Sequence, residues 1–143
     1  MFERKYRASI PDFGHHIVAF GRLPCGGMLP VAYLHMTDAG DGLFLSGGAC
    51  TDGERVRTLP QEAQQALADS GGLMQACLLY AMERFASCDA VAAFCGDARA
   101  LSVTPTVGLE PTDIKHLLVR WMRPLTASRQ RLLLSRARSA MPF

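Results

Sequence analysis

Three apolar segments separated by turn sequences limit most strongly what this chain can fold into. The first two, HHIVAFGRL (15–23) and MLPVAYLHM (28–36), are rich in β-branched and aromatic residues and flank the turn sequence PCGG. The third, GLFLSGGAC (42–50), follows the turn sequence TDAGDG. Short turns of this kind join antiparallel strands. The pattern therefore predicts an antiparallel meander, with an irregular start to its second strand at Pro30.

Helical periodicity follows the meander. TLPQEAQQALADS (58–70) predicts a helix with Thr58 as its cap, and LMQACLLYAMERFAS (73–87) predicts a helix with an apolar, core-facing stripe. The elements expected after these are a strand over 89–96, a short helix over 97–106 and a strand over 116–122. A meander followed by a strand–helix–strand unit predicts an α/β fold, with a mixed, mostly antiparallel sheet and helices on both faces.

The length and composition fit one globular domain over residues 1–143. The chain is 49% apolar and 20% charged, which excludes a disordered polar protein. The segment 124–143 is expected to be a basic helix or tail, because no acidic residue follows Asp113 while seven basic residues do. A solvated helix explains this charge, and so does attraction to an anionic partner such as nucleic acid. No interleaved aromatic residues support the nucleic-acid alternative.

The cysteines and the amino-terminal sequence bear on compartment and metal binding. The five cysteines form no CxxC pair and are odd in number, which favours reduced thiols in the cytoplasm. No secretory signal and no membrane-spanning segment are recognisable. Neither the cysteines nor the four histidines have the spacing of metal ligands, so no metal is expected.

The block from Gly72 to Trp121 resembles the second half of the GNAT acyltransferase superfamily. The segments GGLMQACLLYAMERF, AVAAFCGDARALSV and VGLEPTDIKHLLVRW follow one another in the order of that family: glycine loop, apolar helix, strand, loop, helix, turn and strand. The resemblance implies a GNAT-like fold that is short at the N-terminus, because two helices of the family have no room ahead of the meander. It also implies transfer of an acetyl or other short acyl group from acyl-CoA to an amine by direct attack.

Glycines stand where the resemblance implies contacts with acyl-CoA. Residues 70–73 open the long helix, where successive backbone N–H groups bind phosphate oxygens. Residues 47–50 lie on a strand that in the family splays from its neighbour and leaves peptide groups for the pantetheine arm. The residues expected to bind the acyl-CoA are therefore Gly47, Gly48, Ala49, Cys50, Ser70, Gly71, Gly72, Leu73 and Asp97. The alternative for Gly71 is purely structural, as the end of one helix and the start of the next.

The predicted catalytic residues are Thr104, Asp52 and His35. Thr104 stands where the family has a tyrosine that protonates the leaving thiolate, and a threonine hydroxyl is a far weaker acid than a phenol. Tyr33 and Tyr80 are the candidates to replace it.

Direct attack also needs a base to deprotonate the acceptor amine. Candidate bases near the strand ends are His35, Asp38, Asp52 and Glu54. A covalent mechanism through Cys50 or Cys95 is disfavoured, because neither cysteine has a recognisable activating partner.

Two further expectations concern partners. A small domain without front helices is expected to cover a sheet edge or face by forming a homodimer. In the family the glycine loop has the pattern RxxGxG/A, whose places are taken here by Ala68, Gly71 and Leu73. This atypical loop and the missing tyrosine leave open a second class of function, a non-catalytic GNAT-like module in assembly or regulation with a partner associated with nucleic acid.

Overall fold

The computed structural model describes residues 1–143 and is built on one six-stranded sheet. The strands lie in the order β1-β2-β3-β4-β6-β5, and only the β3–β4 pair is parallel. Their bounds are β1 (His15–Arg22), β2 (Met28–Asp38), β3 (Leu43–Thr51), β4 (Ala90–Phe94), β5 (Glu110–Pro111) and β6 (Leu117–Trp121). The predicted α/β class with a mixed, mostly antiparallel sheet is confirmed.

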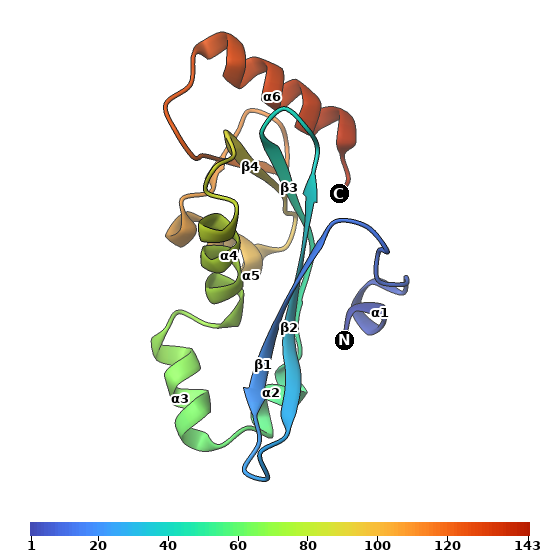
Figure 1. The fold of residues 1–143 in the computed structure, drawn as a ribbon, viewed down its shortest axis with the longest axis vertical. Helices are drawn as coiled ribbons and strands as arrows, with labels where there is room; N and C mark the ends of the chain where they lie inside the picture. The colour runs from blue at the N-terminus through green and yellow to red at the C-terminus, as the bar shows by residue number, and fades with distance from the viewer.

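Helices cover both faces of this sheet. They are α1 (Phe2–Tyr6), α2 (Gly53–Arg57), α3 (Gln61–Asp69), α4 (Leu73–Arg84), α5 (Ala98–Val103) with the 3-10 turn η1 (Thr104–Val107), and α6 (Ala127–Ala140). In Figure 1, α3, α4 and α5 lie on one side of the long β1–β2 hairpin and α1 lies on the other. None of the helices is long and apolar enough to cross a membrane.

Two cores hold the layers together. On one face, α4 packs Cys77, Leu78 and Met82 against β2 and β4. On the other face, α6 packs Leu133 and Ala137 against β3, β4 and β6. β4 is therefore buried on both faces, which explains why its sequence, AVAAF, is apolar throughout.

The meander has the irregularity that Pro30 predicts. The β1–β2 register shifts between Ala19 and Phe20, and Phe20 then pairs with Pro30. On the opposite side the β2–β3 pairing begins only at Ala32. Pro30, which has no N–H group, therefore lies outside the β2–β3 ladder and does not interrupt its hydrogen bonds.

The segment after β3 differs from the prediction. Thr58 does not cap a helix start but ends the short helix α2, and α3 begins after Pro60. The cause lies at Asp52, whose carboxylate caps α2 by accepting a hydrogen bond from the Arg55 N–H at 3.2 Å. The helix α1 was not predicted at all.

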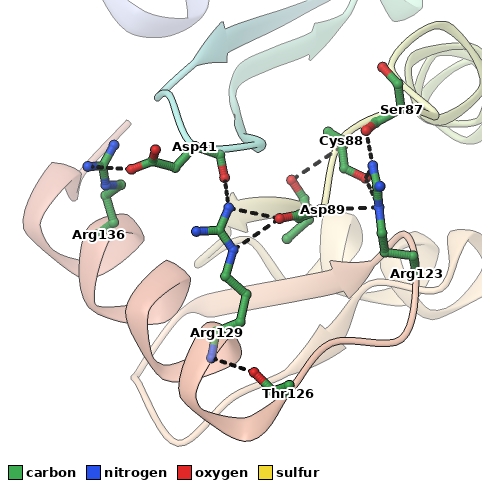
Figure 2. Close-up of polar contacts among 9 residues, drawn as sticks. Asp41, Ser87, Cys88, Asp89, Arg123, Thr126, Arg129 and Arg136 are labelled. Carbon is green, nitrogen blue, oxygen red and sulfur yellow. Dashed lines mark hydrogen bonds and ion pairs between the residues drawn. The ribbon is translucent and has the colours of Figure 1, made fainter.

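The basic C-terminal segment forms the helix α6, which ion pairs hold against the sheet. The Arg129 guanidinium binds the Asp89 carboxylate at 2.8 and 3.0 Å, and Arg123 binds the same carboxylate at 3.1 Å. Arg136 pairs with Asp41 at 2.7 Å. Figure 2 shows that these contacts gather where β3 and β4 begin, since Asp41 lies just before β3 and Asp89 just before β4. Two of the four arginines in residues 124–143, Arg129 and Arg136, are therefore paired within the protein.

The Asp89 cluster supplies a stability prediction. The Asp89→Asn variant is expected to lose about 1–3 kcal/mol of unfolding free energy, because two guanidinium groups lose their charged partner at a site that is only 19% exposed. Asp41→Asn is the matched control, since its side chain is 50% exposed and its pair with Arg136 is worth about 0–1 kcal/mol. Urea unfolding measures both variants, and equal losses would contradict the prediction.

Candidate functional site

The two parallel strands β3 and β4 separate halfway along their length. They pair from Leu43 with Ala90 to Ser46 with Ala93, and no later residue of β3 pairs with β4. β3 continues to Thr51, whereas β4 ends at Phe94, which pairs only with β6. A gap therefore opens beside residues 47–51.

A β-bulge directs β3 away from β4 at this point. Tyr33 pairs with Cys50 and His35 with Gly47, so the two residues Gly48 and Ala49 stand opposite Leu34 alone. Gly48 has a φ of 58°, a left-handed conformation that glycine adopts without strain. Because a bulge bends and twists its strand, this one accounts for the separation of the two strands.

A cavity of about 250 Å³ occupies the gap on the face that α4 and α5 cover; it is called the α4-side cavity below. Its walls come from β2–β4, from the loop before α5, and from α4, α5 and α1. The lining residues are Lys5, Tyr6, Leu34, Ser46, Gly47, Gly48, Ala49, Met74, Leu78, Ala93, Phe94, Cys95, Gly96, Asp97, Ala100, Thr104 and Leu109.

A second, larger cavity of about 760 Å³ lies on the opposite face, between α1 and the C-terminal segment; it is called the α1-side cavity. Its lining residues are Phe2, Tyr6, Ala8, Pro11, Phe13, His35, Thr37, Leu45, Gly47, Gly48, Phe94, Ala140, Pro142 and Phe143. Tyr6, Gly47, Gly48 and Phe94 line both cavities. The two cavities therefore meet at the gap between the strands.

The helix α1 lies across this junction. Lys5 Nζ and the Tyr6 hydroxyl both donate to the carbonyl oxygen of Ala49, at 2.8 and 2.6 Å. Burial raises the pKa of the Tyr6 phenol, which therefore keeps its proton at neutral pH. Sequence reasoning missed both residues. The spacing of Phe2 and Tyr6 was the available signal, because residues four apart share one helix face and these rings lie 4.7 Å apart.

The structure brings five of the predicted site residues to the α4-side cavity. Gly47, Gly48 and Ala49 form its strand wall, and Asp97 and Thr104 belong to its helical wall. The Asp97 carboxylate caps α5, and hydrogen bonds from the N–H groups of Ala100 and Arg99 lower its pKa. The Thr104 hydroxyl is buried and donates to the Leu101 carbonyl at 3.2 Å.

Cys50 and the two alternative tyrosines lie outside both cavities. Cys50 packs with Phe2 and Tyr33 in a small cluster, and burial raises the pKa of its thiol. The buried Tyr33 hydroxyl is hydrogen-bonded to His16 Nδ1 at 2.8 Å. Tyr80 is exposed on α4. Of the chain's three tyrosines, Tyr6 alone lines the cavities.

The start of α4 requires a revision of the predicted phosphate contacts. The N–H groups of residues 70–72 already close the end of α3 by donating to its carbonyl groups. Only the next three N–H groups, those of Leu73, Met74 and Gln75, have no acceptor within the protein, and α4 has no side-chain cap. Met74 lines the α4-side cavity, whereas residues 70–73 do not.

Asp52 is placed as a structural residue. It lies outside both cavities and accepts ion pairs from Arg4 at 3.0 Å and from Arg55 at 3.4 Å. Burial acts to raise the pKa of its carboxyl, but the Arg55 N–H and the Arg4 guanidinium outweigh this effect and hold the pKa below its ordinary value. An ionised carboxylate already held by two guanidinium groups is a poor base.

His35 lies in the wall of the α1-side cavity. Its Nε2 is 2.8 Å from the carbonyl oxygen of Phe13. A carbonyl oxygen only accepts, so the neutral ring carries its proton on Nε2 and donates it there. Nε2 is therefore not available to take a proton from a substrate while this bond holds.

Two further findings concern metal binding and the comparison with known proteins. The structure brings no group of three or more histidine, cysteine, aspartate or glutamate side chains together in an arrangement for a metal ion. No family model, no curated protein and no solved structure matches this chain.

Proposed function

We propose that this protein is an acyl-CoA-dependent N-acyltransferase that moves an acetyl or other short acyl group to an amine by direct attack. The observation that carries the proposal is the separation of β3 from β4 after Ser46 and Ala93, with a cavity on each side of the gap. The resemblance of residues 72–121 to GNAT proteins implies such a separation of two neighbouring strands. In those proteins the helices and strands follow one another in the same order as in this chain.

The α4-side cavity suits the narrow end of an acyl-CoA. Its volume of about 250 Å³ fits an extended pantetheine arm but not the nucleotide. The strand edge of residues 47–50 has no β4 partner, so its peptide groups supply hydrogen bonds to an extended chain. Lys5 and Tyr6 must release the Ala49 carbonyl before a ligand uses it.

The start of α4 supplies the phosphate contacts in this proposal. The free N–H groups of Leu73, Met74 and Gln75 lie at the positive end of the helix dipole, which favours an anion. Since Met74 also lines the cavity, an arm in the cavity leads toward these groups. The pyrophosphate then lies outside the cavity.

Tyr6 takes the role of proton donor, because it is the tyrosine that lines both cavities. The amine nitrogen attacks the thioester carbonyl carbon, a C–N bond forms and the C–S bond breaks. The Tyr6 hydroxyl protonates the leaving sulfur, and the proton lost by the nitrogen restores the phenol. The products are an amide and a free thiol.

Calorimetric titration with acetyl-CoA tests the proposal. The wild-type protein is expected to bind at micromolar to sub-millimolar concentration, whereas no binding at millimolar ligand contradicts an acyl-CoA site. Ala100→Leu fills the α4-side cavity from α5 and is expected to weaken binding by at least about tenfold. Ala98→Leu is the matched control, because Ala98 is exposed on the same helix and lines neither cavity.

The alternative is a non-catalytic module that binds acyl-CoA without turning it over. The buried, hydrogen-bonded Thr104 and the occupied amides of residues 70–72 favour it. Thiol release, followed colorimetrically with a panel of amines, separates the two: binding without thiol release supports the module, and thiol release supports the enzyme. The ion pairs of the C-terminal arginines with Asp89 and Asp41 weigh against a nucleic-acid partner, because they occupy Arg129 and Arg136 of α6 and also Arg123, which precedes the helix.

A homodimer remains part of the proposal. β1 is an edge strand that pairs only with β2, and it carries the exposed side chains of Val18 and Phe20 next to Tyr80 of α4. An exposed apolar sheet edge is a common site of association between identical chains.

A further inference from the structure

The lining of the α1-side cavity is aromatic and carries no acidic side chain. Its aromatic residues come from α1, β2, β4, the segment before β1 and the segment after α6. They are Phe2, Tyr6, Phe13, His35, Phe94 and Phe143. None of the lining residues is Asp, Glu, Lys or Arg. A flat aromatic ligand packs well against such walls, whereas an ammonium ion would lose its hydration without gaining a partner among side-chain carboxylates.

The same region offers no free carboxylate base. His35 Nε2 donates to the Phe13 carbonyl, and Asp52 is held by Arg4 and Arg55 outside the cavity. An alkylamine is protonated at neutral pH and must lose a proton before it attacks a carbonyl. An aromatic amine is uncharged at neutral pH, since its nitrogen lone pair is delocalised into the ring, and it is ready to attack without a base.

From these two observations we infer that the α1-side cavity binds an uncharged aromatic amine as the acyl acceptor. This inference rests on the proposed acyl transfer for the role of the ligand, but the binding site stands on the cavity alone. Gly47 and Gly48 form the shared wall, so the amine nitrogen reaches the acyl group through the gap between β3 and β4. The nitrogen lone pair forms the new C–N bond, the C–S bond breaks, and one N–H proton goes to the thiol product.

Two isomeric probes test the charge preference. 4-Ethylaniline and 2-phenylethylamine have the same formula and similar size, but only the second is a cation at neutral pH. Ligand-observed NMR titration without acyl-CoA is expected to give a dissociation constant for 4-ethylaniline at least about tenfold lower than for 2-phenylethylamine. If the main-chain oxygen of Phe143 over Gly47 instead held an ammonium group, the preference would be reversed, and that result overturns the inference.

A matched pair of variants tests the location. Phe13→Ala removes an aromatic wall of the cavity and is expected to weaken 4-ethylaniline binding by about fivefold. Phe20→Ala is the control, because the two rings are similarly exposed, at 58% and 52%, and Phe20 lies outside both cavities. Equal affinity in the two variants overturns the location.

Failure of the inference and failure of the proposed transfer give different results. Binding of 4-ethylaniline that depends on Phe13 supports the inferred site even if acetyl-CoA yields no N-acetyl product, and the missing product then counts against the transfer alone. Acetylation of 2-phenylethylamine but not of 4-ethylaniline overturns the inference and leaves the transfer standing.

Discussion

The Leu34→Ala variant is expected to lose about 2–5 kcal/mol of unfolding free energy, measured by urea denaturation. Leu34 is fully buried at the centre of β2, where it belongs to the core between the sheet and α4 and also faces the β-bulge at Gly48 and Ala49. Its side chain lines the α4-side cavity as well. Truncation therefore joins new empty volume to an existing cavity, which the surrounding strands cannot close.

Leu79→Ala provides the comparison, because Leu79 lies on α4 and its side chain is 44% exposed. It is expected to cost less than about 1 kcal/mol. A similar small loss for Leu34→Ala would mean that the sheet relaxes around the bulge, and the rigid gap proposed as the ligand site would lose its support.

The sheet was predictable because its strands carry strong local signals. The turn sequences PCGG and TDAGDG mark two of its connections, and the apolar run AVAAF marks the strand that is buried on both faces. Paired glycines within a strand are typical of a bulge or of a close approach by another backbone, and at Gly47 and Gly48 the structure has a bulge.

The helix α1 was not predictable from periodicity. Five residues are too few for a stable isolated helix, and its stability comes from contacts distant in sequence. Phe2 packs on Tyr33 and Cys50, and Arg4 reaches Asp52 and Glu54. The same long-range pairing makes Asp52 a structural residue, although its position after a strand resembles that of a catalytic carboxylate.

The glycine pair at 71 and 72 shows a second limit of sequence reasoning. Positive φ angles of 81° and 92° serve the end of α3, where N–H groups turn back to its carbonyls. A loop that binds phosphate with its amides requires glycine for a similar conformational reason. Only the hydrogen bonds distinguish the two, and they leave the free amides at residues 73–75.

The Tyr6→Phe variant is expected to lower kcat for acyl transfer by about 100-fold, because it removes the proposed proton donor. The KM for acetyl-CoA is expected to stay the same or fall, since the Ala49 carbonyl loses one of its two internal hydrogen bonds and is freer to bind the ligand. Steady-state kinetics separate these two effects. Thr104 does not replace Tyr6, because a threonine hydroxyl is a far weaker acid than a phenol.

The pH profile distinguishes a chemical role of Tyr6 from a structural one. Burial raises the pKa of the phenol, so the acid form persists beyond the pH at which a free phenol ionises, and wild-type kcat is expected to fall only in that alkaline range. This alkaline limb is expected to vanish in Tyr6→Phe, while the midpoint of thermal unfolding changes little. Tyr80→Phe is the matched control and is expected to keep both kcat and the limb, because Tyr80 is exposed outside both cavities. A Tyr6→Phe enzyme with kcat within threefold of wild type and an unchanged profile would show that the leaving sulfur takes its proton from another source.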